Sequence, residues 1–332
     1  MHRIPVIALI VLMLAPPISA FAQSATPAAS SPAAASGDFA GLVDIGGRRI
    51  YLECHGTGSP TVVLVAGYRA SGRYWTDDLL RPDEPRTMVM PAVAESNRVC
   101  TYDRPGTYAS IGEDDFISRS DPIAQPRTAP EVVAELHAVL QAAEVPGPYV
   151  LAGHSLGGFF ARLYASTYPD EVVGLVLVDA YSELLESVMS PEQWQALVRL
   201  NQGLGADTVI PIPGYGDVET IRFGADNAVM REAVAASSLQ PMPLAVLAHG
   251  KPFPLPADDA QGFSAAELEA FIRAENQAKA ALVPDARYSV ATESGHDIHQ
   301  DQPELVTEAI RQVVAGVRNP DTWYDLTSCC AE

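Results

Sequence analysis

The sequence predicts an α/β fold in which helices cover both faces of a parallel sheet. Short apolar runs, typical of buried strands, alternate along the chain with stretches of helical periodicity. One apolar run, residues 148–152, leads directly into the glycine-flanked serine of residues 153–157, GHSLG, and a helical stretch follows it. The chain has 332 residues, of which 48% are hydrophobic, so it can bury a large core.

The strands are predicted from apolar runs and turn signals. Residues 41–45 and 48–54 are expected to pair as a hairpin joined at Gly46 and Gly47. The continuous apolar run 61–66 is typical of a strand buried on both faces. The other predicted strands are residues 97–102, 148–152, 172–178, 244–248 and 287–291.

Helices are predicted between these strands. Residues 130–143 carry apolar side chains at helical spacing, and residues 159–168 follow the serine. Residues 265–281 form a charged amphipathic pattern, and residues 303–317 are the last predicted helix. Strands that alternate with helices in this way favour one parallel sheet with helices on both sides.

The interval between the strands at 172–178 and 244–248 is longer than one crossover helix requires. It contains about sixty residues, with apolar helical stretches near 184–200 and a passage rich in proline and glycine at 210–216. Long insertions in compact domains are often lids or binding elements. We therefore predict that residues 181–241 form a cap over the active site, and the alternative is a structural elaboration away from it.

This assignment divides the chain into a core and peripheral segments. The core is predicted to consist of residues 39–180 and 242–320 on either side of the cap. Residues 23–38, which are rich in alanine, serine and proline, are expected to form a flexible leader. Residues 321–332 are expected to form a C-terminal tail.

The N-terminus has the pattern of a signal peptide. A short basic start precedes the apolar residues 4–14, and residues 20–22 fit an Ala-x-Ala cleavage site. Cleavage after Ala22 is therefore expected, which would make the protein periplasmic or secreted. The alternative of a membrane anchor is disfavoured, because about eleven apolar residues cannot span a bilayer that needs roughly 20.

The charge of the chain limits its partners. The formal net charge is −20, and there is no run rich in lysine or arginine. Such a surface repels nucleic acid and anionic membranes, so neither is an expected partner. A small-molecule substrate is expected instead, and the sequence leaves the oligomeric state open.

Four cysteines are consistent with an oxidising compartment. The predicted fold places Cys54 and Cys100 on neighbouring strands, so a disulfide between them is one hypothesis and two buried thiols are the other. Cys329 and Cys330 could tie down the tail, form a vicinal ring or pair between chains. No Cys-x-x-Cys or histidine spacing favours zinc, and no cofactor or metal is expected.

Ser155 is the candidate nucleophile. It lies in a Gly-x-Ser-x-Gly pattern between a predicted strand and a predicted helix, which is the context of a nucleophile elbow. Gly153 and Gly157 would let strand and helix approach without side-chain clashes. The helix start would place backbone N–H groups near the charge that develops in acyl transfer.

A serine nucleophile needs a base and a group that orients the base. His296 is the candidate base, because it follows a glycine in the loop after the last predicted strand. His299 could be structural or a substitute base. His249 ends the preceding strand and could line the pocket.

The acid is open between two positions. Asp179 ends the strand that follows the nucleophile helix, and it is the favoured candidate. Asp258 and Asp259 lie after the next strand, in a loop that could fold back. A capping or loop hydrogen bond is the structural alternative for Asp179. Asp297, beside the base, is too constrained to orient it.

The oxyanion requires two backbone donors. The N–H of Leu156 is expected to be one. The second is expected from the loop after the strand at 61–66, where Gly67 permits a sharp turn and Tyr68 supplies the N–H. Tyr68, Tyr74 and Trp75 could form an aromatic wall for substrate, or equally could be packing residues.

Residues 102–106, YDRPG, form a strand-to-turn junction. We expect this junction to be held by an ion pair between Asp103 and Arg104. Its predicted role is architectural.

Together these motifs resemble the α/β-hydrolase superfamily, in particular exported bacterial serine hydrolases related to simple esterases. The resemblance covers residues 41–317 and rests on residues 61–67, 102–106, 153–158, 175–179 and 295–296. It implies an eight-stranded, mostly parallel sheet and an acyl-transfer mechanism without a cofactor, and the cap predicted from the long interval then follows the sixth strand. It also implies Ser155 as nucleophile, His296 as base and Asp179 as acid.

Two departures from the family pattern are visible. Ala66 replaces the usual histidine of the oxyanion loop, which should leave the backbone donor intact. The usual acid after the seventh strand is absent.

The expected function is hydrolysis of carboxylic esters by an exported serine hydrolase, because esters require the least beyond a triad and an oxyanion hole. The alternatives are a peptidase, an amidase or another acyl hydrolase with the same triad, and a ligand receptor without catalysis.

Overall fold

The computed structural model describes residues 37–111, 114–203, 218–253 and 264–325. All of them belong to the compact unit Ser31–Glu332. The predicted signal peptide, nearly all of the leader, Asp258, Asp259, Cys329 and Cys330 lie outside the described residues. No helix in the described ranges has the length and apolar character needed to cross a membrane.

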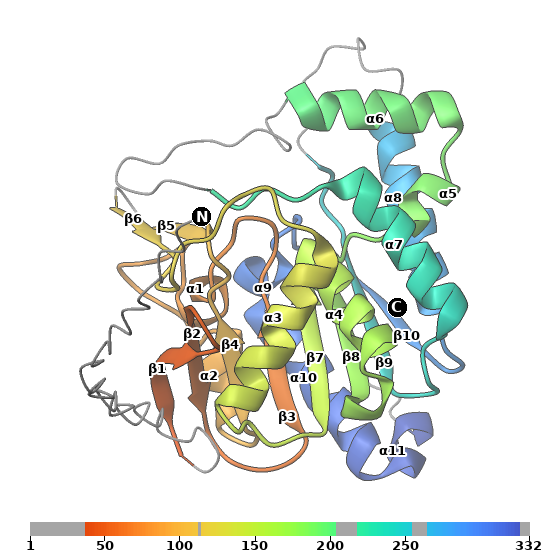
Figure 1. The fold of residues 1–332 in the computed structure, drawn as a ribbon. Coiled ribbons are helices and arrows are strands. Elements are labelled where there is room, and N and C mark those ends of the chain that lie inside the picture. The colour runs from red at the N-terminus through yellow and green to blue at the C-terminus, as the bar shows by residue number, and fades with distance from the viewer. Residues whose placement is uncertain (1–36, 112–113, 204–217, 254–263, 326–332) are drawn as a thin grey trace, which may run out of the picture. The chain divides into compact units, whose positions relative to one another are not determined.

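Eight strands form the main sheet, and two further strands form a small sheet at its side (Figure 1). The main strands are β1 (Phe39–Asp44), β2 (Arg49–His55), β3 (Thr61–Val65), β4 (Val99–Tyr102), β7 (Tyr149–His154), β8 (Val172–Val178), β9 (Leu244–His249) and β10 (Arg287–Ala291). The small sheet pairs β5 (Tyr108–Ile111) with β6 (Asp114–Ile117).

The main sheet has the order β1-β2-β4-β3-β7-β8-β9-β10. The pairs from β4 to β10 are parallel, and the two pairs that involve β2 are antiparallel. The sheet is therefore mostly parallel and eight-stranded, as the sequence predicted. Because β3, β7, β8, β9 and β10 run in one direction, their carboxyl ends meet at one edge of the sheet.

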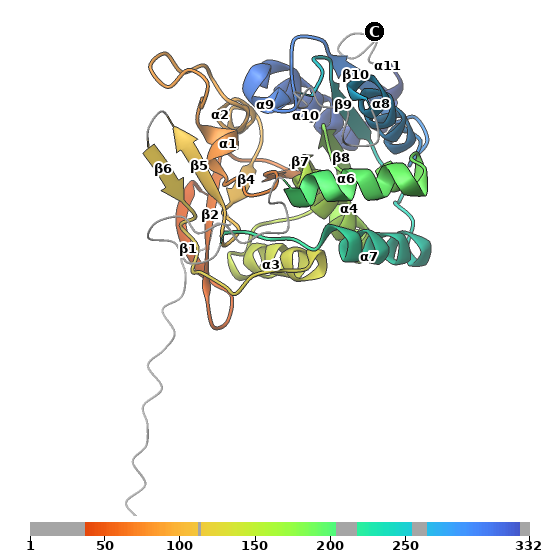
Figure 2. The ribbon, with the colours of Figure 1, turned by 90° about the horizontal axis from the view of Figure 1, so that it is seen from above.

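Helices occupy both sides of this sheet (Figure 2). They are α1 (Arg73–Thr76), α2 (Val89–Ala94), α3 (Ala129–Ala142), α4 (Leu156–Thr167), the 3-10 helix η1 (Pro169–Glu171), α5 (Leu184–Ser187), α6 (Pro191–Gly203), α7 (Phe223–Ala236), α8 (Ala265–Ala280), α9 (Ile298–Asp301), α10 (Pro303–Arg318) and α11 (Pro320–Asp325). Figure 2 shows α3, α4 and α7 on one face and α1, α2, α9 and α10 on the other.

Two apolar clusters fill the space between sheet and helices, one on each face. The first contains Leu136 of α3, Phe160 of α4 and Met230 of α7. The second contains Trp75 of α1 and Ile310 of α10. The sequence could not decide whether Trp75 lines a substrate wall, and its complete burial makes it a core residue.

The hairpin between β1 and β2 is confirmed. Gly46 and Gly47 have φ angles of +87° and +102°, which suit glycine because it has no Cβ to clash. The turn is closed by a hydrogen bond of 3.0 Å from the Ile45 N–H to the Arg48 carbonyl oxygen. This antiparallel pair forms the edge of the sheet farthest from β10.

Cys54 and Cys100 form a disulfide. They lie directly opposite each other in the antiparallel register of β2 and β4, and both are buried. The disulfide hypothesis is therefore confirmed over the alternative of two free thiols. It joins the hairpin edge to the parallel part of the sheet across 46 residues of chain.

The segment between β8 and β9 contributes to two different regions. Its helix α7 packs against α4 within the first core cluster. Leu185 and Leu197, from α5 and α6, instead form a separate apolar cluster with Leu268 of α8. Figure 1 shows α6 beyond the sheet edge at which α4 begins. The assignment of residues 181–241 as a cap stays a prediction, with α5 and α6 as its described helical parts nearest this position.

Candidate active site

Ser155 lies at the turn between β7 and α4. Its backbone has φ +52° and ψ −124°, a region that residues with a side chain rarely adopt. The turn is held by a 3.0 Å bond from the Ser155 N–H to the Val178 carbonyl oxygen and by another from the Tyr181 N–H to the Ser155 carbonyl oxygen. Such strain, imposed by surrounding bonds, marks a candidate functional position.

The glycines around Ser155 are required by close backbone packing. A Cβ on Gly157 would lie 2.6 Å from the Ala66 carbonyl oxygen, and a Cβ on Gly67 would lie 2.9 Å from His154 Nδ1 and 3.2 Å from the Ser155 Cβ. A side chain at Gly157 would force the backbone segments apart, and a side chain at Gly67 would crowd the side chains of His154 and Ser155. The loop after β3 therefore lies directly against the serine turn, as the oxyanion hypothesis requires.

His296 and Asp179 meet at the same edge of the sheet. Asp179 directly follows β8 and is buried, while His296 lies in the loop between β10 and α9 and its side chain is 31% exposed. His296 Nδ1 is 2.5 Å from Asp179 Oδ2. The structure thus brings together two of the predicted site residues that are 117 positions apart in the chain.

The protonation of this pair follows from the chemistry of the carboxylate. Burial opposes ionisation of Asp179, but hydrogen bonds from His249 and His296 outweigh it and hold the pKa of Asp179 far below its usual value. An ionised carboxylate only accepts hydrogen bonds, so the proton of neutral His296 lies on Nδ1. Nε2 of His296 is then unprotonated, which is the form that a general base requires.

The expectation that Asp103 and Arg104 pair with each other is wrong. Asp103 accepts bonds from the Gly72 N–H at 2.9 Å and from Arg119 Nε at 2.7 Å. Arg104 instead pairs with Glu219, with Nε 2.6 Å from Oε1. Consecutive residues of an extended chain point in opposite directions, so two neighbours at a strand end cannot easily pair with each other.

The predicted oxyanion donors belong to the two segments that meet at the serine turn, since Leu156 follows Ser155 and Tyr68 follows Gly67. Leu156 is the first residue of α4, so its N–H has no partner within the helix. Tyr68 follows Gly67 in the loop after β3, and its ring packs edge-on against Phe223 with centroids 5.3 Å apart. This contact gives Tyr68 a packing role in addition to its predicted backbone role.

Comparison with known proteins identifies the family. The sequence pattern of the alpha/beta hydrolase family matches residues 62–309, which is most of the chain. The chain belongs to the alpha/beta hydrolase family. The match runs from β3 to α10 and so includes the serine turn, Asp179 and His296.

Curated relatives are similar over different shares of their length. An AB hydrolase superfamily protein of Gibberella zeae is 24% identical over 301 residues, which are 78% of this chain and 87% of that protein. An uncharacterized protein of Schizosaccharomyces pombe is 34% identical over 151 residues, 40% of this chain but 26% of that protein. A putative carbamate hydrolase of Escherichia coli is 32% identical over 124 residues, 37% of this chain and 38% of that protein. The chain thus matches only part of the latter two proteins.

Solved structures share the fold at low sequence identity. Est816, described as an N-acyl homoserine lactone degrading enzyme, has a TM-score of 0.50 and 20% identity over 82% of this chain and 99% of its own. A putative lipase of Acinetobacter baumannii has a TM-score of 0.51 and 18% identity, with coverages of 86% and 93%. The carboxylesterase CesB of Bacillus subtilis has a TM-score of 0.50 and 16% identity, with coverages of 84% and 92%. These similarities confirm the alpha/beta hydrolase fold.

A second histidine, which was expected only to line the pocket, binds the same carboxylate. His249 ends β9, and its Nδ1 lies 2.8 Å from Asp179 Oδ2. Its Nε2 lies 3.0 Å from Glu269 Oε2 on α8. The signal in the sequence was a histidine at the strand end where this family usually carries the acid.

His249 is cationic in this environment. Burial lowers the pKa of His249, but the bond to Asp179 and the charges of Asp179 and Glu269 outweigh it and raise the pKa to about 9. A charged His249 donates from both ring nitrogens, one to each carboxylate. The two carboxylates hold this ring in place, and the ring in turn fixes Asp179 beside His296.

The raised pKa of His249 predicts a stability that depends on pH. Its contribution is fully present below the unfolded value of 6.5 and is lost as the pH rises through about 9. We expect His249→Gln to lower the free energy of unfolding at pH 6 by about 2 kcal/mol, with the difference from wild type shrinking toward pH 10. Urea unfolding between pH 6 and 10 measures this difference. His137→Gln reports the loss of a histidine elsewhere, and a difference independent of pH would contradict the assignment.

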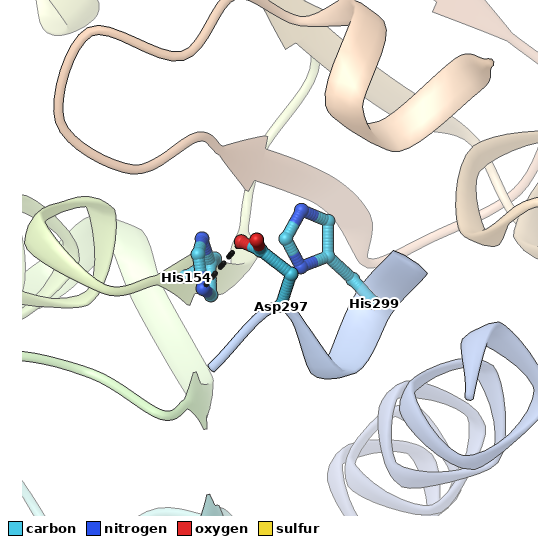
Figure 3. Close-up of side chains that lie close together, drawn as sticks. All are labelled: His154, Asp297 and His299. Carbon is cyan, nitrogen blue, oxygen red and sulfur yellow. Dashed lines mark ion pairs between the residues drawn. The ribbon is translucent and has the colours of Figure 1, made fainter. Parts of the chain in front are cut away.

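Within the described ranges, three side chains could hold a metal ion: His154, Asp297 and His299 (Figure 3). One ligand atom of each lies within 4.8 Å of the others. A tetrahedral zinc site has bonds of about 2.0–2.2 Å and needs its ligand atoms roughly 3.5 Å apart. The rings of His154 and His299 also lie against each other, with centroids 4.2 Å apart and their planes tilted by 40°. The cluster would have to contract and rotate to hold an ion.

This histidine cluster has a clearer role in supporting the base loop. Burial and, to a lesser extent, the nearby His296 together lower the pKa of His154 to about 3. Burial also lowers the pKa of His299 well below its usual value. His154 is therefore neutral, and its Nε2 lies 3.0 Å from the His296 carbonyl oxygen, to which it donates. The residue before the serine thus anchors the backbone of the candidate base.

Proposed function

We propose that this protein is an exported serine hydrolase that cleaves carboxylic esters through an acyl-enzyme. The observation that carries the proposal is the 2.5 Å contact between His296 Nδ1 and Asp179 Oδ2 at the sheet edge where Ser155 occupies a strained turn. A base with an oriented proton, beside a serine on an elbow, is the arrangement that acyl transfer needs.

The proposed reaction has two steps. Nε2 of His296 takes the Ser155 proton while Oγ bonds to the ester carbonyl carbon, and the N–H groups of Leu156 and Tyr68 bind the oxyanion. The carbon–oxygen bond to the alcohol then breaks, and His296 gives its proton to the leaving oxygen. In the second step His296 takes a proton from water, hydroxide adds to the acyl carbon, and Ser155 leaves with its proton restored.

Esters are proposed as the substrate class because their hydrolysis requires little beyond a triad and an oxyanion hole. Two proteins with the same fold are described as a putative lipase and a carboxylesterase, names that denote ester hydrolysis, and a third is described as an N-acyl homoserine lactone degrading enzyme, whose substrate contains a cyclic ester. Their low sequence identity supports no finer choice of acyl group or alcohol.

Export is proposed from two observations. The first 22 residues carry the signal-peptide pattern. A buried disulfide joins Cys54 and Cys100, and disulfides persist in oxidising compartments outside the cytosol.

Labelling with a fluorophosphonate tests the proposal, because this probe bonds only to a serine made nucleophilic by its surroundings. We expect intact-mass spectrometry to find one adduct per chain, peptide mapping to place it on Ser155, and His296→Ala to lose it. The labelled sample should lose hydrolysis of p-nitrophenyl esters in proportion to the adduct. A folded protein that turns over esters without any adduct on Ser155 would refute the proposed nucleophile.

A further inference from the structure

The loop that carries the second oxyanion donor is held by a buried arginine. Arg104 follows β4, and its side chain is fully buried. Its Nη1 donates to the Ala66 carbonyl oxygen at 2.9 Å, and its Nη2 donates to the Gly67 carbonyl oxygen at 2.5 Å. One guanidinium therefore binds the two successive peptide groups that end β3 and begin the loop.

These two bonds set the direction of the backbone donors. A trans peptide is planar, and its C=O and N–H point in opposite directions. With the Gly67 carbonyl turned toward Arg104, the Tyr68 N–H of the same peptide group points away from the guanidinium. Gly67 also packs against the serine turn, because a Cβ there would lie 3.2 Å from the Ser155 Cβ.

Glu219 holds Arg104 in this position and also binds the loop itself. Its Oε1 accepts from Arg104 Nε at 2.6 Å, and its Oε2 accepts from Arg104 Nη2 at 3.0 Å. Oε2 also accepts from the Arg69 N–H at 2.7 Å, where Arg69 has a φ of +61°. The carboxylate thus fixes both the guanidinium and a strained residue next to Tyr68.

The same carboxylate links the loop to the insertion between β8 and β9. Glu219 lies just before α7, within the predicted cap region 181–241, and its N–H donates to the Gly106 carbonyl oxygen at 2.8 Å. The fully buried ion pair between Arg104 and Glu219 therefore connects the loop after β3, the end of β4 and the insertion. A desolvated ion pair needs further hydrogen bonds to offset its burial, and the carbonyl oxygens of Ala66 and Gly67 supply two of them.

We propose that Arg104, fixed by Glu219, is a positioning residue that turns the Tyr68 N–H toward the oxyanion of the reacting ester. This inference rests on the proposed esterase function. Arg104 touches no reacting atom, and it acts through the peptide group of Gly67 and Tyr68. An arginine suits this task because its planar fork can bind two carbonyl oxygens and a carboxylate together, which a lysine ammonium cannot do with the same geometry.

Arg104→Lys is the direct test, since it keeps the buried charge for Glu219 and removes the fork. We expect kcat for a p-nitrophenyl ester to fall by about 10- to 100-fold, less than the loss of a whole oxyanion donor, with KM within about twofold. A trifluoromethyl ketone adds to the serine and forms an oxyanion, so its Ki should rise by the same factor as kcat/KM falls. A substrate-like competitive inhibitor without an electrophilic carbon should keep its Ki.

Three controls separate this role from a structural one. Turnover is divided by the fluorophosphonate adduct at completion, so that misfolded protein is not counted. Arg127→Lys removes the fork of another buried arginine, which pairs with Glu135 at 3.1 Å, and it should retain wild-type kcat. Glu219→Gln weakens the contact that holds Arg104 but leaves Arg104 itself in place, so kcat and the affinity for the ketone should fall together, by less than in Arg104→Lys. This variant replaces Arg104→Lys as the test if Arg104→Lys does not fold.

The outcomes distinguish the two proposals. If wild-type protein forms no adduct on Ser155, the proposed function fails. If the adduct forms but kcat per labelled serine and the ketone Ki of Arg104→Lys and Glu219→Gln match wild type, the positioning role fails while the esterase proposal stands. A parallel fall in kcat/KM and ketone affinity, absent in Arg127→Lys, supports the role.

Discussion

Ser155→Ala is expected to lower kcat for ester hydrolysis by about 10⁴- to 10⁶-fold. Without Oγ no acyl-enzyme forms, and only the oxyanion donors and substrate binding remain to assist water. The stability should change little, because alanine keeps the Cβ and Ser155 is only half buried. Initial rates with p-nitrophenyl esters and urea unfolding measure the two quantities.

A glycine at the same position separates strain from chemistry. Ser155 has a φ of +52°, which glycine adopts without steric cost. We therefore expect Ser155→Gly to be as inactive as Ser155→Ala but more stable by about 1 kcal/mol. Residual turnover in Ser155→Ala near the wild-type rate would mean that another residue is the nucleophile.

The sequence predicted those parts of the fold that depend on residues close together in the chain. The observed ends of all eight main strands lie close to the predicted ends, because most of the strands are short apolar runs and the others are short segments next to turn residues. The meeting of His296 with Asp179 was predictable for a related reason. Both follow strands of a parallel sheet, and the carboxyl ends of such strands meet at one edge.

The parts that the sequence did not reveal depend on partners far apart in the chain. Arg104 and Glu219 are separated by 115 residues, and neither lies in a pattern that indicates the other. The local rule that paired Arg104 with its neighbour Asp103 was wrong because side-chain direction, not proximity in sequence, decides the contact. The second partner of His249 was not predicted for the same reason. Glu269 lies on α8, and no local sequence pattern indicates that this helix packs against His249.

The helix α7 shows that not every part of a long insertion belongs to a cap. The interval 181–241 was assigned as one cap because it is long, yet Met230 of α7 is part of the core cluster with α4. The prediction had no helix there, since the apolar residues of α7 form only a weak stripe. Length alone therefore indicates extra structure, and the packing partners decide which of its helices belong to the core.

Asp179→Asn is expected to lower kcat by about 10⁴-fold with little change in KM. The ionised carboxylate of Asp179 holds the proton of His296 on Nδ1, with Nδ1 2.5 Å from Oδ2. An amide can present its N–H₂ to Nδ1 instead, which favours the tautomer with the proton on Nε2, and that nitrogen can then accept no proton from serine. The cation of His249 would also lose one of its two carboxylate partners.

Two other variants make the assignment of the acid specific. Asp297→Asn removes a carboxylate beside the base that bonds to neither ring nitrogen of His296, and it should retain activity within a few-fold. The double variant Asp258→Asn/Asp259→Asn tests the other candidate acids, and it should do the same. Steady-state kinetics of the three proteins, each with its fluorophosphonate-labelled fraction, give the comparison. If the double variant loses turnover and Asp179→Asn keeps it, the acid is Asp258 or Asp259, and Asp179 serves to bind His249.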